Sequence, residues 1–247
     1  MFIKITSWLE RNVIWTNTYG LARSLLGLGT FSTLILNSTD VLFKTTYESI
    51  SFCDPLGLSL YCIFDNLLVG KLISIAFLIL IISGWRPVIT GILHWWVMYS
   101  FTNSAVVLDG GDHIASIITL LLVPITLTDN RKWHWNKPKL KPTNTWFGVK
   151  SLIGLSSVLV IKIQVSIIYL NSAAAKLSVR EWTDGTAIYY WFKHPVFGYL
   201  NWLDAILEPL ILNGTILFII SWGTIIFEFI LFSGLFVSSP ENRTVLN

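Results

Sequence analysis

Six long apolar stretches constrain this chain more than any other feature of its sequence. A helix needs about 20 mostly apolar residues to cross the roughly 30 Å hydrocarbon layer of a bilayer. Charged residues make up only 13% of the chain, against about a quarter in a soluble domain. We therefore predict an all-α integral membrane protein, with one membrane domain over residues 1–247 and about six transmembrane helices. The predicted helices are Tyr19–Leu36, Leu67–Gly84, Pro87–Phe101, His113–Thr128, Ser151–Ala173 and Thr215–Val237.

The distribution of Lys and Arg predicts how these helices are oriented. Cytoplasmic loops of membrane proteins carry an excess of both residues. The loop from Asp129 to Lys150 is strongly basic, Arg86 lies in the turn before Pro87, and the loop after the first helix is acidic. We therefore expect both termini in the cytoplasm. Arg23, inside the first stretch, favours a retained helix over a cleavable signal peptide. The basic residues also need no nucleic-acid partner, because topology explains them.

An aromatic segment separates the last two predicted helices. Trp and Tyr side chains gather where a membrane meets water. The stretch that follows, Ala205–Leu212, is apolar but contains Pro209, which lacks a backbone N–H. We predict an external interfacial or re-entrant helical segment here. The aromatic residues are Tyr189, Tyr190, Trp191, Phe192, Phe197, Tyr199 and Trp202.

One face of the fifth predicted helix is polar. Lys162, Ser166, Tyr169 and Lys176 are separated by four, three and seven residues, which places them on one side of an α-helix. A charged Lys in mid-span costs about 2.5–3.5 kcal/mol and faces protein or water rather than lipid. Two interpretations are compatible: this face lines a cavity, or Lys162 pairs with an acid such as Glu228. Lys176, at the outer end, is either a snorkelling cation or a base of lowered pKa.

His113 begins the fourth predicted helix, behind the polar segment Asp109–Asp112. Asp112 is the predicted N-cap, because its carboxylate would lie close to the free N–H groups of the first turn. His113 is either a site residue or an incidental part of this cap. His94 is expected to be structural and His134 to lie at the membrane interface. No His pair has the spacing of metal ligands, so we predict no metal site.

Cys53 and Cys62 are the only cysteines and lie in the predicted external loop. In an oxidising compartment two such residues usually form a disulfide, which is our prediction. A redox pair that passes electrons to a quinone and two free thiols are the alternatives.

The segment YLNSAAAKLSVREWTDGTA, residues 169–187, resembles the signature of the horizontally transferred transmembrane domain, the superfamily of the vitamin K-dependent γ-carboxylases. The segment DGGDHIASIITLLLVPITLTDN resembles its second motif, with His113 at the polar head. The resemblance implies an extracytoplasmic active site in which Lys176 deprotonates a reduced quinone of the vitamin K type and His113 assists the carbanion step. The positions implied for cofactor binding are Lys162, Gln164, Tyr169 and Trp182.

A closer resemblance lies near the start of the chain. WTNTYGLARSLLGLGTFSTLILNSTDVLF and CDPLGLSLYC resemble the sporulation-delaying protein B branch of that superfamily. Members are bacterial cell-membrane proteins needed to mature an exported peptide toxin. The resemblance implies a secreted peptide precursor, a small accessory protein and membrane lipid as partners. The family usually continues with another hairpin of helices after the one that carries Glu228, and this chain is expected to lack it.

Three hypotheses follow. The first is a multi-pass protein required for maturation of an exported peptide toxin, a bacteriocin-like product, at the outer membrane face. The second is a quinol-dependent, carboxylase-like enzyme that modifies a peptide, with Lys176 as base and His113 polarising the developing anion. The third is a non-catalytic scaffold or immunity-type membrane protein, in which these side chains only satisfy one another.

Overall fold

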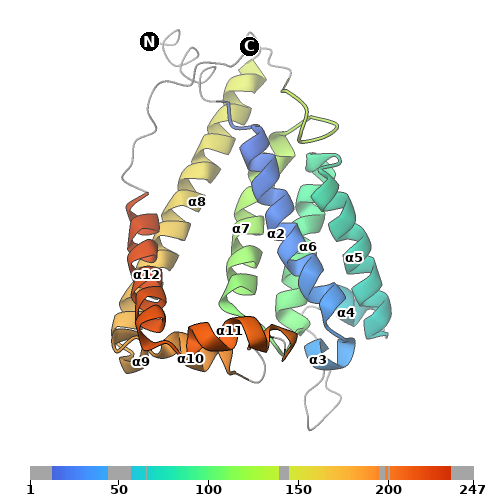
Figure 1. Cartoon of the computed structure of the whole chain (residues 1–247). Helices are drawn as coiled ribbons and strands as arrows, with labels where there is room; N and C mark the ends of the chain where they lie inside the picture. The colour runs from blue at the N-terminus through green and yellow to red at the C-terminus, as the bar shows by residue number, and fades with distance from the viewer. Residues whose placement is uncertain are drawn as a thin grey trace. The chain divides into compact units, whose positions relative to one another are not determined.

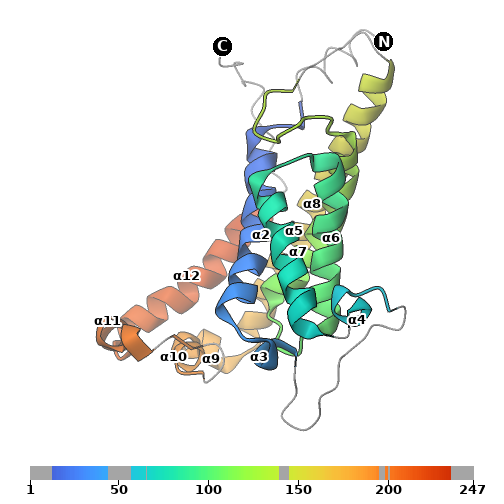
Figure 2. The same cartoon turned by 90° about the vertical axis from the view of Figure 1, so that its right-hand side faces the viewer.

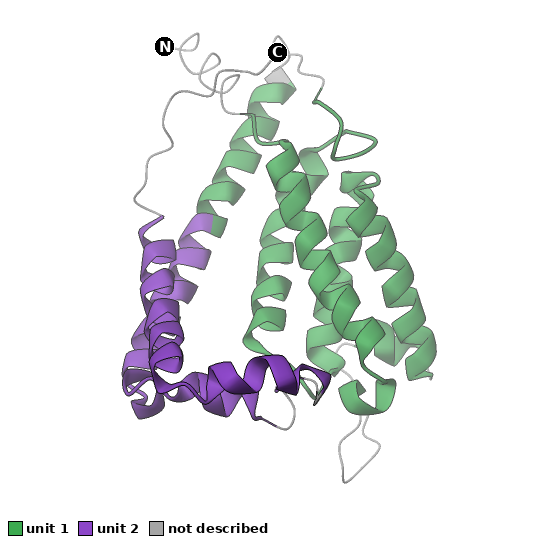
Figure 3. Cartoon of the chain, in the orientation of Figure 1, with its two compact units in different colours: residues 1–161 green, residues 162–247 purple. Residues whose placement is uncertain are grey.

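The computed structural model describes residues 13–43, 57–64, 66–138, 145–194, 198–199 and 201–234. Throughout these ranges the regular structure is helical, apart from one isolated bridge between Trp85 and Trp133. The all-α prediction is thereby confirmed. The chain divides into two compact units, residues 1–161 and residues 162–247 (Figure 3). The prediction of one membrane domain stays a prediction.

Helices occur at all six predicted positions. Four of the described helices, α2, α7, α8 and α12, are long and apolar enough to cross a membrane. α5 has 17 residues and is therefore about 25 Å long, and α6 buries polar side chains of Thr90, His94 and Ser100. The four long helices support a membrane protein, while a count of six spans is not confirmed. The six helices are α2 (Asn17–Leu36), α5 (Leu67–Ser83), α6 (Pro87–Ser104), α7 (Gly110–Thr128), α8 (Thr145–Leu177) and α12 (Gly214–Ser233) (Figure 1).

In unit 1, α2, α5, α6 and α7 pack along their lengths (Figure 2). α6 and α7 approach each other closely at Gly91, where an added Cβ would overlap the side chain of Thr126. Small residues let helix backbones approach in this way. The absence of a side chain at Gly91 is therefore a condition of the α6–α7 contact.

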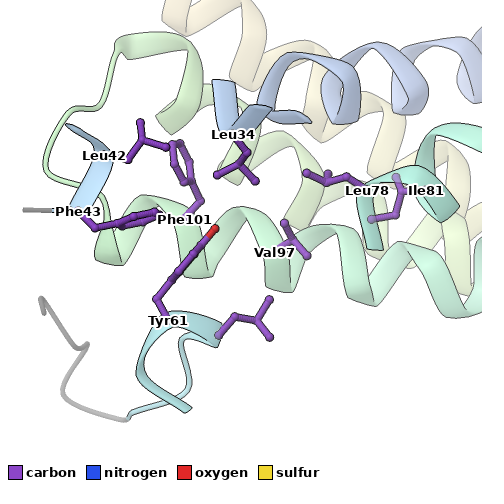
Figure 4. Close-up of a cluster of buried hydrophobic side chains, with 9 residues drawn as sticks. Leu34, Leu42, Phe43, Tyr61, Leu78, Ile81, Val97 and Phe101 are labelled. Atoms are coloured by element: carbon purple, nitrogen blue, oxygen red, sulfur yellow. The ribbon is translucent and has the colours of Figure 1, made fainter. Parts of the chain in front are cut away.

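An apolar core begins at one end of unit 1 and extends along the bundle to Ile81, near the end of α5 (Figure 4). It joins α2, α5 and α6 to two short helices, α3 (Thr39–Phe43) and α4 (Leu60–Ile63). The Phe43 ring centroid lies 4.3 Å from that of Tyr61 and 6.2 Å from that of Phe101. Burial raises the pKa of the Tyr61 phenol to about 12. The described parts of the loops predicted to be external thus pack against the bundle.

The opposite end of unit 1 brings three predicted cytoplasmic segments together. The Trp15 indole donates to Thr128 Oγ1 over 3.2 Å, which joins the start of α2 to the end of α7. The backbone N–H of Arg86 donates to the carbonyl of Lys132 over 2.8 Å. Arg86, the residue before Pro87, adopts a φ of 35° in this tight α5–α6 turn. The segments predicted to be cytoplasmic therefore lie together at one end of this unit, while their orientation in a membrane stays a prediction.

His134 is completely buried within the protein at this end, while its expected position at the membrane interface stays a prediction. A Cβ added at Gly20 or Gly84 would collide with its ring, so both glycines make room for it. Its backbone N–H donates to the Gly84 carbonyl over 2.9 Å, and Nε2 lies 3.4 Å from the hydroxyl oxygen of Ser24. His94 is buried as well, which agrees with a structural position.

Lowering the pH from 7 to 5 is expected to destabilise the protein through His134. Burial, with Arg23 and Arg131 nearby, lowers the pKa of His134 from 6.5 to about 4. The unfolded chain binds the proton more readily, so the stability present above pH about 6.5 is lost as the pH falls toward 4. The variant His134→Gln should lose about 1–2 kcal/mol less than the parent between pH 7 and pH 5. Thermal unfolding at both pH values measures this, and equal pH sensitivity in the two proteins would contradict it.

Unit 2 contains the second part of α8, α12 and the segment that joins them. α9, α10 and α11 pack against α12. Pro209 lies inside α11, where its missing N–H removes one helical hydrogen bond. The prediction of a helical segment here is confirmed for the described residues. The short helices are α9 (Arg180–Thr183), α10 (Ala187–Phe192), the 3₁₀ turn η1 (Asn201–Leu203) and α11 (Asp204–Ile211).

Candidate functional site

The candidate site lies in unit 2, where the last turn of α8 meets α12. The ammonium Nζ of Lys176 donates to Glu228 Oε1 over 2.6 Å and to Ser172 Oγ over 2.6 Å. The Ser172 hydroxyl donates in turn to the same Glu228 oxygen over 3.0 Å. Lys176 Nζ also lies 5.1 Å from the centroid of the Trp182 ring, within the range of a cation–π contact. These four side chains form one polar cluster.

Local sequence explains why the cluster forms. Ser172 precedes Lys176 by four residues, so the two share one face of α8. Small residues at 173–175 surround this face, and Ala173 is fully buried. At this point Glu228 of α12 lies within hydrogen-bond distance of Lys176.

The turn after α9 holds Trp182 in place. Gly185 has a φ of 84°, and a Cβ there would lie 2.9 Å from the Phe218 Cα, so only glycine fits without strain. Ser221 of α12 donates to the Gly185 carbonyl over 3.2 Å, and the Trp222 indole donates to the Thr183 carbonyl over 3.3 Å. The turn that follows Trp182 is thereby fixed to the same helix that carries Glu228.

The two charges of the cluster are largely removed from solvent. The side chain of Lys176 is 17% exposed and that of Glu228 is 11% exposed. A desolvated charge is tolerated when it is paired and hydrogen-bonded. Glu228 Oε2, however, is buried without a hydrogen-bond partner in the described residues. The cluster therefore has one carboxylate oxygen that can accept a proton or a hydrogen bond from another molecule.

This arrangement can perform two kinds of chemistry. In its charged form, Lys176 is an ammonium group that can stabilise negative charge developing on a molecule bound beside α8. If its proton moved to Glu228, a neutral amine would remain that could act as a base. Ser172 would hold that amine in position through its hydroxyl.

Of the four residues predicted to bind a cofactor, Trp182 belongs to the cluster, and the other three lie earlier on α8. Trp182 contacts Lys176, as described. Gln164 and Tyr169 are half-buried and Lys162 is exposed. Gln164 follows Lys162 by two residues, so it projects from a different face of α8. The binding roles proposed for Lys162, Gln164 and Tyr169 therefore stay predictions.

Sequence reasoning missed Ser172 and misjudged the partner of Glu228. Glu228 was considered for Lys162, yet its carboxylate pairs with Lys176. Ser172 had a usable signal, because it stands four residues before Lys176 on the face already singled out. The partner of Glu228 had no such signal, since α8 and α12 are 52 residues apart at this contact.

His113 is exposed in the first turn of α7. The N-cap of this helix is Asp109, whose side chain accepts from the Asp112 backbone N–H over 2.9 Å, so the assignment of Asp112 as N-cap is wrong. Asp112 instead completes a capping box by accepting from the Asp109 N–H. His113 belongs to unit 1 and Lys176 to unit 2. A shared pocket for these two side chains therefore stays a prediction.

The cysteine pairing also stays a prediction. Cys62 lies in α4, and Cys53 lies outside the described residues.

Long apolar helices that turn their polar groups toward one another define an integral membrane protein with several helices. The chain belongs to the family of the sporulation-delaying protein SdpB. It is 38% identical to SdpB of Bacillus subtilis (strain 168) over 241 residues, covering 94% of this chain and 72% of SdpB. It is also 40% identical to the uncharacterised protein YitO of the same organism over 247 residues, covering 98% of this chain and 78% of YitO. No protein-family model and no solved structure matches.

Proposed function

We propose that this protein is a bacterial cell-membrane component required to mature an exported peptide toxin, and that it acts at the outer membrane face. Its 38% identity to a sporulation-delaying protein supports a role in such a toxin pathway. The observation that carries the proposal is the largely buried cluster of Ser172, Lys176 and Glu228, which offers an amine and a carboxylate oxygen without a hydrogen-bond partner in the described residues. Its partners would be the secreted peptide precursor, membrane lipid and a small accessory protein.

The proposed orientation rests on the positive-inside rule. Arg86 and Lys132 are hydrogen-bonded through their backbones at one end of unit 1. By this rule we assign that basic end to the cytoplasm. α8 begins after the same basic loop and crosses the membrane once, so Lys176 at its far end faces outward. Both termini are then cytoplasmic.

The test is deletion of the gene in its bacterial host, followed by mass spectrometry of the secreted peptides. A mature peptide should disappear on deletion, and its precursor should accumulate at the membrane. Expression of the gene from a second locus should restore the peptide. An unchanged set of secreted peptides would contradict the proposal.

A second candidate is a peptide-modifying enzyme that uses a reduced quinone of the vitamin K type. The favourable observation is the amine of Lys176 within 2.6 Å of a carboxylate that could take its proton. Within the described structure, Trp182 is the one residue proposed for the cofactor that contacts Lys176. The mass of the mature peptide decides: carboxylation of one Glu adds about 44 Da, and an unmodified peptide excludes this candidate.

A third candidate is a scaffold or immunity-type protein in which Lys176 and Glu228 only hold α8 and α12 together. The favourable observation is that the two groups satisfy one another directly. This candidate predicts that the peptide still matures when both charges are removed together. The first proposal differs from this candidate in giving a role to Glu228 Oε2, which has no hydrogen-bond partner in the described residues.

A further inference from the structure

Arg23 is a completely buried cation in α2 of unit 1. Its Nη2 donates to the Thr90 hydroxyl oxygen over 2.9 Å. Apart from an interaction with the Tyr19 hydroxyl, its Nε and Nη1 have no hydrogen-bond partner in the described residues. Arginine keeps its charge in proteins, and burying an unpaired charge costs far more than burying a paired one. The side chain therefore lacks the acceptors that its burial requires.

The nearest carboxylate does not supply them. Asp129 is buried, but Arg131 takes both of its oxygens, with Nε 2.9 Å from Oδ1 and Nη2 2.8 Å from Oδ2. Thr90 is a neutral acceptor whose own hydroxyl donates to the Trp85 carbonyl over 2.8 Å. Arg131 thus occupies the one carboxylate near the two guanidinium groups, and Arg23 has no paired carboxylate within the described residues.

Other polar groups around Arg23 are also unsatisfied. The buried hydroxyl of Tyr19, one turn earlier on the same face of α2, interacts with Arg23, and its O–H has no acceptor in the described structure. His94 follows Thr90 by one turn on α6, and its buried Nε2 has no partner either. This Nε2 lies 3.7 Å from the position of a Cβ at Gly27, one turn beyond Arg23. The unsatisfied groups therefore come from the facing sides of α2 and α6.

We propose that this cluster of Tyr19, Arg23, Thr90 and His94 binds one oxyanion, a carboxylate or phosphate group. The anion would neutralise Arg23, accept from its Nε or Nη1, and take hydrogen bonds from the phenol and imidazole. Such charge-assisted hydrogen bonds are stronger than neutral ones. The proposal is independent of the function proposed for the Lys176 cluster.

A phospholipid headgroup and a free anion are both possible sources of the group. Arg23 lies six residues into α2, about 9 Å from its start. Trp15, Trp85 and Trp133 lie at this end of unit 1, and Trp gathers at the depth of lipid headgroups. Both sources present the same chemical group, an oxyanion that can reach Arg23 from the membrane–water interface.

The experiment measures thermal unfolding of the purified full chain in detergent, with potassium phosphate titrated at constant ionic strength against chloride. At a phosphate concentration of about ten times Kd, the unfolding midpoint should rise by about 3–6 °C. The same rise with sodium acetate would identify a carboxylate as an equally good occupant. If native mass spectrometry finds a retained phospholipid instead, exchange into lipid-free detergent should lower the midpoint.

Arg23→Met should abolish both the response to anions and the retention of phospholipid. The matched control is Lys71→Met, a cation of the same unit whose Nζ donates to the Asn37 carbonyl, and it should respond like the parent. The proposal is overturned if the parent protein neither responds to oxyanions nor retains phospholipid. It is also overturned if Arg23→Met unfolds at a higher temperature than the parent in every buffer, since that marks a buried charge with no counterion. The parent measurements decide the matter even where the variant fails to accumulate.

Discussion

Replacing Lys176 with Met is expected to lower the amount of mature secreted peptide about tenfold or more, while the protein still accumulates in the membrane. The change removes the amine that lies 2.6 Å from both Glu228 and Ser172. It keeps most of the aliphatic side chain, so packing against Trp182 is largely retained. The measurement is the ratio of mature peptide to membrane-inserted protein in a deletion strain that expresses the variant.

Lys193 provides a matched control for this substitution. It also pairs with carboxylates and lies 5.4 Å from the centroid of an aromatic ring, that of Tyr199. Its side chain is 37% exposed, however, and its contacts with Asp204 and Glu208 are 3.8 and 3.6 Å long. Solvent-exposed pairs of this kind contribute little to stability. Lys193→Met should therefore leave peptide maturation near the parental level, and an equal loss in both variants would point to a general effect of lost charge.

Gly91→Leu is expected to destabilise the protein by about 3 kcal/mol or more, because it overpacks the contact between α6 and α7. Even a single Cβ at this position would overlap the Thr126 side chain. Thermal unfolding of the purified variant measures the loss, and a sharp drop in membrane-inserted protein should accompany it. Gly29→Leu is the matched control, because a Cβ on this exposed glycine of α2 meets no atom within 4 Å. Equal stability of the two variants would contradict the packing described for unit 1.

The sequence located the helices well because apolar periodicity and length are local properties. All six predicted positions are helical, and the helices differ from the predictions chiefly at their ends. α8 runs from Thr145 to Leu177, beyond the predicted Ser151–Ala173, since a helix can continue past the apolar region that defines a span. The N-cap of α7 was misplaced because Asp109 and Asp112 are both good capping residues, and only the reciprocal hydrogen bonds distinguish them.

The candidate site was predicted less completely because it depends on contacts between distant segments. Lys176 was recognised from its position and its motif, whereas its pairing with Glu228 required the packing of α8 against α12. The burial of Arg23 and His134 was equally inaccessible, since it depends on which faces of unit 1 pack inward. Charged side chains are rarely fully buried in proteins, so a prediction from sequence assigns such groups to the surface.

The double variant Lys176→Met/Glu228→Leu tests the central claim most directly. Replacing both members of a desolvated ion pair with apolar residues is often neutral for stability, so the protein should accumulate at the parental level. The quantity to measure is mature secreted peptide per membrane-inserted protein in the deletion strain. Loss of the mature peptide with normal protein accumulation is the predicted result, because the amine and the carboxylate take part in maturation. Full production of mature peptide by this variant would contradict the account and leave the pair as a structural contact between two helices.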